Sequence, residues 1–140
     1  MKSIQENQKK AIEDRVGAYV KAYLNADAKG LQESFFKEAV LYSAEKDRLD
    51  SLPFGEWLPS IETRKKKGDL RSGSSEILSL DITEHAASVK LRLRLAAMEF
   101  TDYLTLIELQ QDWKIIAKTY TVHVPDQKSE ASLVAQQEVS

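Results

Sequence analysis

The sequence has 140 residues, 42% of them hydrophobic and 30% charged, a composition that fits one globular domain with a sizeable core. Twenty basic and 22 acidic residues give a net charge of −2, without the basic excess of nucleic-acid-binding proteins, so we expect no nucleic acid partner. The chain has no cysteine and only two histidines, which excludes disulfides and argues against a zinc site, and we expect neither a metal nor a cofactor. The first residues lack the apolar core of a signal peptide and no run could span a bilayer, so we expect a cytoplasmic protein without membrane contact.

The first third of the sequence predicts two helices in series. Apolar residues recur every three or four positions from about Ile4 to Asn25, which indicates one long amphipathic helix. The carboxylate of Asp27 can accept from free amides of the next turn, so it is expected to cap a short helix that runs through Phe35 and Phe36.

A short strand, a connector and a third helix are predicted next. Residues 39–43 have the composition of a strand, and the charged residues 44–50 are expected to connect it to a helix over 56–67. Pro59 lacks an amide donor, so the regular part of that helix should begin close to Gly55 or be kinked at the proline. The cationic run 64–67 can be read as a phosphate-binding patch, but cations before a glycine are the usual ending of a helix, and we prefer that interpretation.

The second half of the sequence predicts an antiparallel meander. After Gly73 the apolar residues alternate with polar ones, and the last two strands form a hairpin over Phe100–His123 that is rich in β-branched and aromatic residues. Helices first and strands last indicate an α+β fold, with the N-terminal helices packed on one face of a curved, mainly antiparallel sheet. We expect a single domain over residues 1–124 and a polar C-terminal tail over 125–140.

The register of the meander follows from its turns. Two-residue turns are predicted at residues 85–86, 99–100 and 111–112. The resulting pairs are Ile82 with Val89, Leu80 with Leu91, Leu93 with Leu106, Leu106 with Ala117, and Asp102 with Thr121. In this register the apolar residues of all strands share the inner face, although a one-residue slip or bulge would exchange the two faces.

The predicted inner face is aliphatic at one end and polar at the other, where Asp102, Thr121 and His123 gather. A few polar groups on an apolar concave face are what a ligand pocket needs, because apolar walls hold a molecule that directed hydrogen bonds orient. We expect these three side chains to line a ligand cavity that Tyr23 and Trp57 close on its other side. The alternative is that Asp102 lies at the rim and only stabilises the hairpin, and that the aromatic residues are ordinary core.

The predicted outer face is too apolar for a surface that is fully solvated. It includes Ile107, Ile116, Lys118 and Val122 beside arginine and tyrosine side chains. This mixture is typical of a protein contact, and we expect a homodimer through the sheet. The residues expected at or near that contact are Arg92, Arg94, Tyr103 and Tyr120.

Three stretches of the sequence resemble a known superfamily. They are residues 18–42, the helical segment GEWLPSI at 55–61, and FTDYLTLIELQQDWKIIAK at 100–118. The chain is similar over residues 11–124 to the nuclear transport factor 2-like proteins, which include the SnoaL-like polyketide cyclases, and most of all to the branch called putative lumazine-binding. The resemblance implies a cone-shaped, cystatin-like α+β fold, a homodimer, and a cavity between the helices and the sheet. It does not imply catalysis.

Two functions from different classes follow from these observations. The first is a homodimer that binds an unidentified small apolar or cyclic ligand without established catalysis. The second is a cone-type lyase or isomerase in which Asp102 is the general base and His123 assists it, since burial in an apolar cone would make the carboxylate a stronger base. A third possibility, a pure association module, would require side chains to fill the cone.

Overall fold

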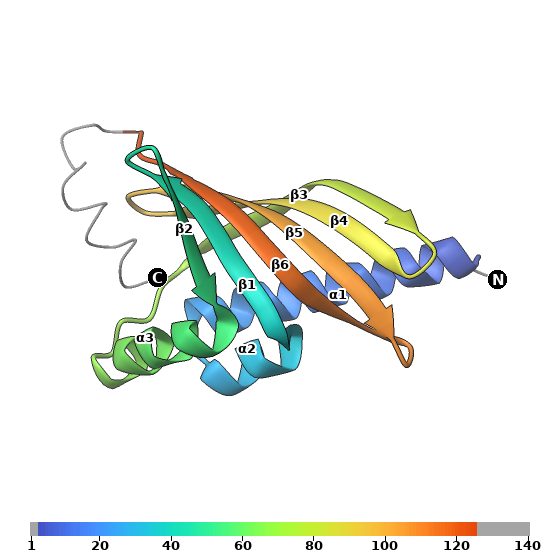
Figure 1. The fold of residues 1–140 in the computed structure, drawn as a ribbon, viewed down its shortest axis with the longest axis horizontal. Coiled ribbons are helices and arrows are strands. Elements are labelled where there is room, and N and C mark those ends of the chain that lie inside the picture. Colours follow the sequence, from blue (N-terminus) through green and yellow to red (C-terminus); the bar gives the residue numbers. More distant parts are fainter. Residues whose placement is uncertain (1–2, 126–140) are drawn as a thin grey trace.

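The computed structural model describes residues 3–125, which form three helices and a six-stranded sheet (Figure 1). In chain order the elements are α1 (Ile4–Leu24), α2 (Ala28–Ser34), β1 (Phe35–Glu45), β2 (Arg48–Pro53), α3 (Phe54–Lys66), β3 (Gly73–Thr83), β4 (Ala86–Leu95), β5 (Glu99–Leu109) and β6 (Asp112–His123). The strand order is β2-β1-β6-β5-β4-β3, and every neighbouring pair is antiparallel except β1 and β6. The α+β class is confirmed, while the predicted tail lies outside the described residues from position 126 onward.

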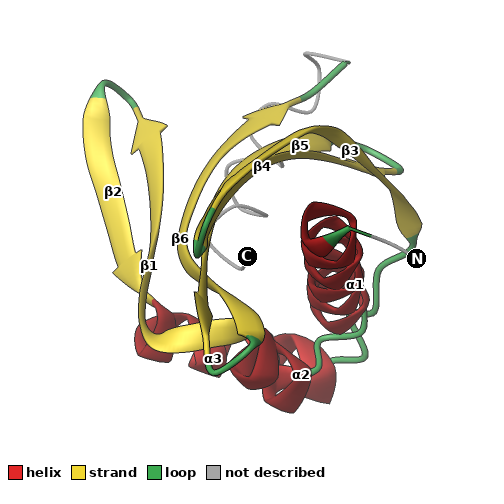
Figure 2. Cartoon of the chain, turned by 90° about the vertical axis from the view of Figure 1, so that its right-hand side faces the viewer, coloured by secondary structure: helices red, strands yellow, loops and turns green. Residues whose placement is uncertain are grey.

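The sheet is strongly curved, and α1 lies inside the curve (Figure 2). Ser3 starts this helix, because its hydroxyl accepts from the backbone N–H of Glu6. The stripe predicted from the sequence is buried against the sheet, and its members are Ile12, Val16, Tyr19, Val20 and Tyr23. The helix therefore supplies one wall of the interior. None of the helices between residues 4 and 66 has both the length and the apolar character needed to span a membrane.

The segment after α1 confirms some predicted boundaries and corrects others. Asp27 caps α2 as expected, with its carboxylate accepting from the N–H of Gly30 at 3.0 Å. The helix ends at Ser34, however, and Phe35 already belongs to a strand much longer than the predicted 39–43. The predicted connector 44–50 instead contains a tight turn and the start of β2. The third helix begins at Phe54 and keeps Pro59 inside it, close to the predicted start.

Turn positions differ from the predicted ones, which shifts the strand pairs. Ile82 lies opposite Ala87 rather than Val89, and Leu93 lies opposite Phe100 rather than Leu106. The last turn is Gln110-Gln111, with Leu109 opposite Asp112. Both glutamines have a positive φ, 53° and 64°, as the two central residues of a type I′ hairpin turn require. Glutamine is not a usual turn residue, so the sequence carries no marker for this turn.

One bulge in the β5–β6 pair decides which side chains of β6 face inward. Leu106 pairs with Ile115, whereas Thr105 pairs with Ala117, so Ile116 is the extra residue. The displaced turn alone would leave the inner face of β6 as predicted, but the bulge reverses it for the rest of the strand. Beyond the bulge the inward residues are Lys118, Tyr120 and Val122, and the exposed residues are Thr119, Thr121 and His123. Two predictions are wrong for this reason. Thr121 and His123 were expected to face inward, and Lys118, Tyr120 and Val122 were expected to face outward.

Candidate functional site

A polar cluster of Tyr19, Asp102 and Lys118 lies deep between α1 and the sheet. Asp102 projects inward from β5 and is 1% exposed, which confirms its predicted placement on the inner face. The Tyr19 hydroxyl, from the buried stripe of α1, donates to Asp102 Oδ2 at 2.7 Å. Lys118 Nζ, on the neighbouring strand β6, is 3.9 Å from the same oxygen, which is an ion pair but too long for a hydrogen bond. The three elements α1, β5 and β6 therefore bring a phenol, a carboxylate and an ammonium group to one point.

Four aromatic rings surround the ammonium group of Lys118. Its Nζ is 5.0 Å from the ring centroids of Trp57 and Tyr120 and 5.4 Å from those of Tyr19 and Tyr23. Rings at these distances attract a cation through their electron-rich faces, and the attraction grows when water is excluded. The residue is 5% exposed, so the aromatic cage partly replaces the water that the charge has lost.

Two phenols of this region keep their protons at neutral pH. Burial raises the pKa of Tyr19 well above its usual 10, and the negative charge of Asp102 with the hydrogen bond to it raises this pKa further. Burial also raises the pKa of Tyr120. Tyr19 is therefore a fixed hydrogen-bond donor to Asp102.

One atom of the polar cluster is completely buried and has no hydrogen-bond partner within residues 3–125. It is Asp102 Oδ1, which accepts from no group, whereas Lys118 Nζ has its ion pair with Oδ2 and the four rings around it. Buried polar atoms are normally satisfied, and each exception calls for an explanation. The pair could receive a molecule that donates to Asp102 Oδ1 and offers an acceptor to Lys118 Nζ.

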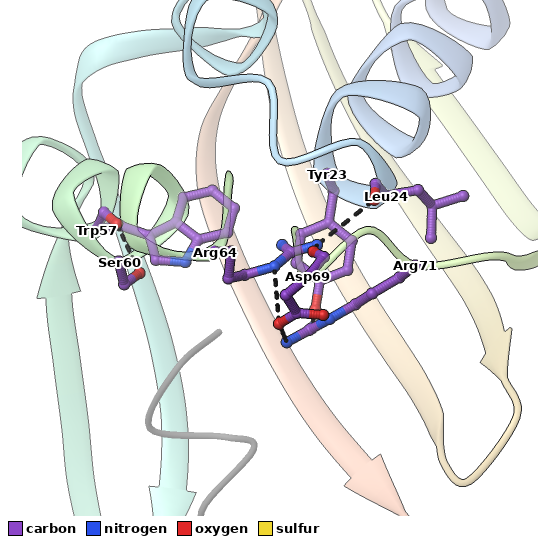
Figure 3. A network of polar contacts seen from close by, with 7 residues as sticks. All are labelled: Tyr23, Leu24, Trp57, Ser60, Arg64, Asp69 and Arg71. Carbon is purple, nitrogen blue, oxygen red and sulfur yellow. Dashed lines mark hydrogen bonds and ion pairs between the residues drawn. The ribbon is translucent and has the colours of Figure 1, made fainter. Parts of the chain in front are cut away.

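A second group of charges, the arginine cluster of Arg64, Asp69 and Arg71, lies beside the ring of Tyr23 (Figure 3). The guanidinium carbons of Arg64 and Arg71 are 4.9 and 5.5 Å from the centroid of that ring, and Arg71 also donates to the Tyr23 hydroxyl. One oxygen of Asp69, Oδ2, lies 3.6 Å from Arg64 Nε and 3.3 Å from Arg71 Nη2. Tyr23 thus connects the arginine cluster with the aromatic cage of Lys118.

A hollow of about 340 Å³ adjoins the arginine cluster. It lies between the connection from α3 to β3 and the loop between β4 and β5. Its lining residues are Asp69, Leu70, Arg71, Ser72, Leu95, Ala96, Ala97 and Met98. Four further hollows lie elsewhere, the largest two of about 600 and 610 Å³, and none of the five is lined by Tyr23, Trp57 or Asp102. The polar cluster is therefore separate from these five hollows.

The predicted site residues divide into two groups. Tyr23, Trp57 and Asp102 lie around one point, where the first two form part of the cage of Lys118, and their role in ligand binding stays a prediction. Thr121 and His123 are exposed on the opposite face of the sheet and cannot join them. The prediction that these two residues line the cavity is therefore wrong.

Sequence reasoning missed several residues that the structure brings to this region, among them Tyr19, Arg64, Lys118 and Tyr120. Lys118 and Tyr120 were missed because nothing in the sequence marks the bulge at Ile116. Arg64 was assigned to an ordinary helix ending, although its side chain is completely buried. The one available signal was its position, three residues after Ile61 on the apolar side of α3.

Comparisons with known proteins agree with this architecture. Residues 7–121 match the family described as "Putative lumazine-binding". A nuclear transport factor 2-like (NTF2-like) protein of unknown function from Silicibacter pomeroyi DSS-3 superposes with a TM-score of 0.76 at 21% identity, over 86% of this chain and 100% of that one. An NTF2-like protein of unknown function from Shewanella baltica OS155 gives 0.72 at 21% identity, over 88% and 98% of the two chains. A protein of unknown function from Mycobacterium tuberculosis gives 0.66 at 11% identity, over 96% and 89%.

No curated protein matches the sequence significantly. The structural neighbours establish the fold alone, since all are below 25% identity. The family match extends over well more than half of the 140 residues. The chain therefore belongs to the family described as "Putative lumazine-binding", and it is a ligand-binding domain of unestablished activity with the NTF2-like cone fold.

Proposed function

We propose that the protein binds a small, flat, cyclic molecule at the polar cluster, next to Tyr23 and Trp57. The observation that carries this proposal is Asp102 Oδ1, a completely buried acceptor without a hydrogen-bond partner, beside Lys118 Nζ and its four aromatic rings. Leaving a buried donor or acceptor without a partner destabilises a protein by about 1–3 kcal/mol per group. A ligand that donates to Asp102 Oδ1 would remove this cost on binding.

The shape of the ligand follows from the aromatic residues. Tyr23 and Trp57 are stacked with centroids 6.3 Å apart and planes inclined by 23°, so both present flat faces in nearly the same orientation. A planar ring with an N–H next to a carbonyl would stack on such faces while donating to Asp102 and accepting from Lys118. Lumazine, which the family name contains, is a bicyclic molecule with such a cyclic imide, and this supports the choice of ligand class.

Catalysis by Asp102 is not part of this proposal. The lyase or isomerase alternative needs His123 beside Asp102, but His123 is exposed on the other face of the sheet. Tyr19 already donates to Oδ2 of Asp102, so this oxygen is engaged within the protein. No observation therefore favours the enzyme over the binding protein.

We also propose that the convex face of the sheet forms a homodimer. Tyr103 is 49% exposed there, and Ile107 and Ile116 are only partly buried, so an apolar strip crosses β5 and β6. Arg92 and Arg94 lie beside it and both pair with Glu99. Tyr120, which the sequence suggested for this contact, faces inward and is left out.

Light scattering should give the mass of a dimer, and Ile107→Lys with Ile116→Lys should give a monomer. A monomeric parent protein would contradict this interface.

Calorimetric titration with lumazine tests the binding site, after a thermal-shift screen of lumazine and other planar cyclic imides. A ligand that binds the folded state raises the melting temperature by mass action. Asp102→Asn and Lys118→Gln should each weaken binding at least about tenfold, the scale of one hydrogen bond to a charged group. His123→Ala is the matched control on the convex face and should bind like the parent protein. Unchanged affinity in both inner variants, or no binding of any planar imide at millimolar concentration, would contradict the proposal.

A further inference from the structure

We infer that a second ligand site lies at the end of the molecule where α1 begins, and that it binds a neutral molecule rich in hydroxyl groups, of which a monosaccharide is the simplest case. The site is a hollow of about 540 Å³ lined by α1 and by the turns of the β3–β4 and β5–β6 hairpins, which lie on the same side of the molecule as the N-terminus (Figure 1). Its lining residues are Ile4, Asn7, Gln8, Ala11, His85, Glu108, Gln111 and Trp113. None of them belongs to the polar cluster, so this inference stands apart from the proposed function.

Trp113 brings to this hollow an N–H donor that lacks an acceptor. Its side chain is 2% exposed, and its Nε1 is completely buried with no hydrogen-bond partner within residues 3–125. An indole N–H can only donate, and a buried tryptophan usually finds an acceptor for it. Because Trp113 is part of the lining, a molecule bound in the hollow can supply the missing acceptor.

The carboxylate of Glu108 decides the charge of the ligand. Its side chain is 18% exposed, and its Oε1 lies 2.9 Å from His85 Nδ1. Within residues 3–125 it is the one carboxylate of the lining, which contains no lysine or arginine there. An anionic acceptor for Trp113 would be repelled by Glu108, whereas a hydroxyl can accept from the indole and donate to a carboxylate. The acceptor that fits is therefore uncharged and carries a proton of its own.

The rest of the lining favours a hydroxyl-rich molecule over a flat ring. Asn7 and Gln111 are exposed and contribute amide groups that both donate and accept, as hydroxyl groups do. The indole of Trp113 is almost fully covered, so it presents no open face on which a flat ring could stack. The volume of the hollow lies within the range of small-molecule sites, roughly 300–1,000 Å³, and is ample for one sugar.

Two hydrogen bonds hold the walls of the hollow in place. Gln8 Nε2 donates to the carbonyl oxygen of Glu84 at 2.9 Å, which joins α1 to the β3–β4 turn. The backbone N–H of Glu108 donates to the carbonyl oxygen of His85 at 2.9 Å, which joins that turn to β5. The three elements are therefore in position before a ligand arrives, and this lowers the cost of ordering them on binding.

The indole N–H signals in a nitrogen–proton NMR correlation spectrum test the site, because the chain has only two tryptophans. Glucose, galactose and mannose are the probes. At least one of them should move the Trp113 signal saturably and leave the Trp57 signal in place, whereas lumazine should move the Trp57 signal, so the two sites succeed or fail separately. No saturable shift of Trp113 by any of the three sugars up to the limit of solubility would overturn the inference. Acetate or N-methylacetamide that moves this signal at a lower concentration than every sugar would overturn the assignment to a hydroxyl-rich ligand.

Substitutions in the lining separate the loss of a contact from general damage. Trp113→Phe keeps an aromatic ring but removes the donor, so calorimetric titration should show an affinity for the sugar that is lower by roughly two- to tenfold, the scale of one neutral hydrogen bond. Asn7→Ala, at an exposed position of α1, should also weaken binding, and Gln32→Ala, exposed on α2 and outside the lining, is the matched control that should not. Unchanged affinity in both lining variants would contradict the site.

Glu108→Gln gives a test with opposite signs. The amide keeps the shape of the side chain but removes its negative charge, so the sugar should bind several-fold more weakly while acetate should now move the Trp113 signal. A loss of folding would weaken every probe and would not produce this gain. Sugar and acetate binding that both stay as in the parent protein would overturn the role of Glu108 in selecting a neutral ligand.

Discussion

The two ends of the interior are similarly buried, but only one of them holds charged side chains. At one end Leu106 lies opposite Ile115 and Ala87 in a purely apolar environment, and Leu106 and Ile115 have no exposed surface. At the other end Asp102 and Lys118 are 1% and 5% exposed, yet Asp102 Oδ1 has no hydrogen-bond partner. Burial alone therefore does not separate a core from a candidate site. A buried ion pair does, because a core that serves only stability can hold apolar side chains of similar volume in its place.

The strongest way to break this comparison is to remove one charge from the polar end. Lys118→Met should lower the free energy of unfolding by about 3–5 kcal/mol, since it leaves the buried carboxylate of Asp102 without a cation. Urea denaturation measures the change. The double variant Asp102→Leu with Lys118→Met should regain most of the loss, because an apolar pair of similar volume needs no compensation. A loss below about 1 kcal/mol in the single variant would mean that Asp102 is not held as an ion.

The aliphatic end should respond to truncation alone. Leu106→Ala is expected to cost about 2–5 kcal/mol, the range for a fully buried leucine whose removal leaves a cavity. Its partner in the sheet is Ala87, not the predicted Leu93, but the side chain is inside in either register. Leu109→Ala, at a residue 58% exposed, is the control and should change stability by less than about 0.5 kcal/mol. Similar losses in the two variants would show that the faces of β5 are wrongly assigned.

A smaller effect is expected at the hydrogen bond that orients Asp102. Tyr19→Phe keeps the ring against Phe35 but removes the donor to Asp102 Oδ2, so we expect a loss of about 1–3 kcal/mol. The same urea transitions measure it. A neutral or stabilising effect would argue that Asp102 obtains its partner from elsewhere, and the orientation of the carboxylate would need revision.

Alkaline pH should lower the free energy of unfolding through Tyr19, at the polar end of the interior. The pKa of Tyr19 is raised in the folded protein above its usual 10, so above pH 10 the unfolded chain loses a proton that the folded protein keeps. The contribution of Tyr19 to stability is thus complete below pH 10 and is lost as the pH rises through its folded-state pKa. The expected slope is up to about 1.4 kcal/mol per pH unit. Tyr19→Phe should lose less stability than the parent between pH 9 and 11, and parallel curves would contradict the raised pKa.

The sequence predicted the framework better than the site, for reasons that particular residues show. The stripe on α1 and the cap at Asp27 are local patterns, so they were found correctly. Asp102 was also placed inside correctly, since β5 alternates between polar and apolar residues. In β6 the odd-numbered and the even-numbered residues could each form a buried face, since one set includes Ile115 and Ala117 and the other Ile116 and Tyr120. Only the bulge decides which set faces inward. A charged residue such as Lys118 is then assigned to the surface by default, and the site loses its central cation.

Two tryptophans allow the comparison to be measured directly, one at each end of the interior. Trp57 lies 5.0 Å from Lys118 Nζ, whereas Trp113 lies at the start of β6, next to the aliphatic end. With 5-fluorotryptophan incorporated, the fluorine NMR spectrum should contain one signal from each, and Trp57→Phe and Trp113→Phe assign them. Our account predicts that lumazine shifts the Trp57 signal and leaves the Trp113 signal in place. A shift of Trp113 with Trp57 unchanged would contradict a ligand site at the polar cluster.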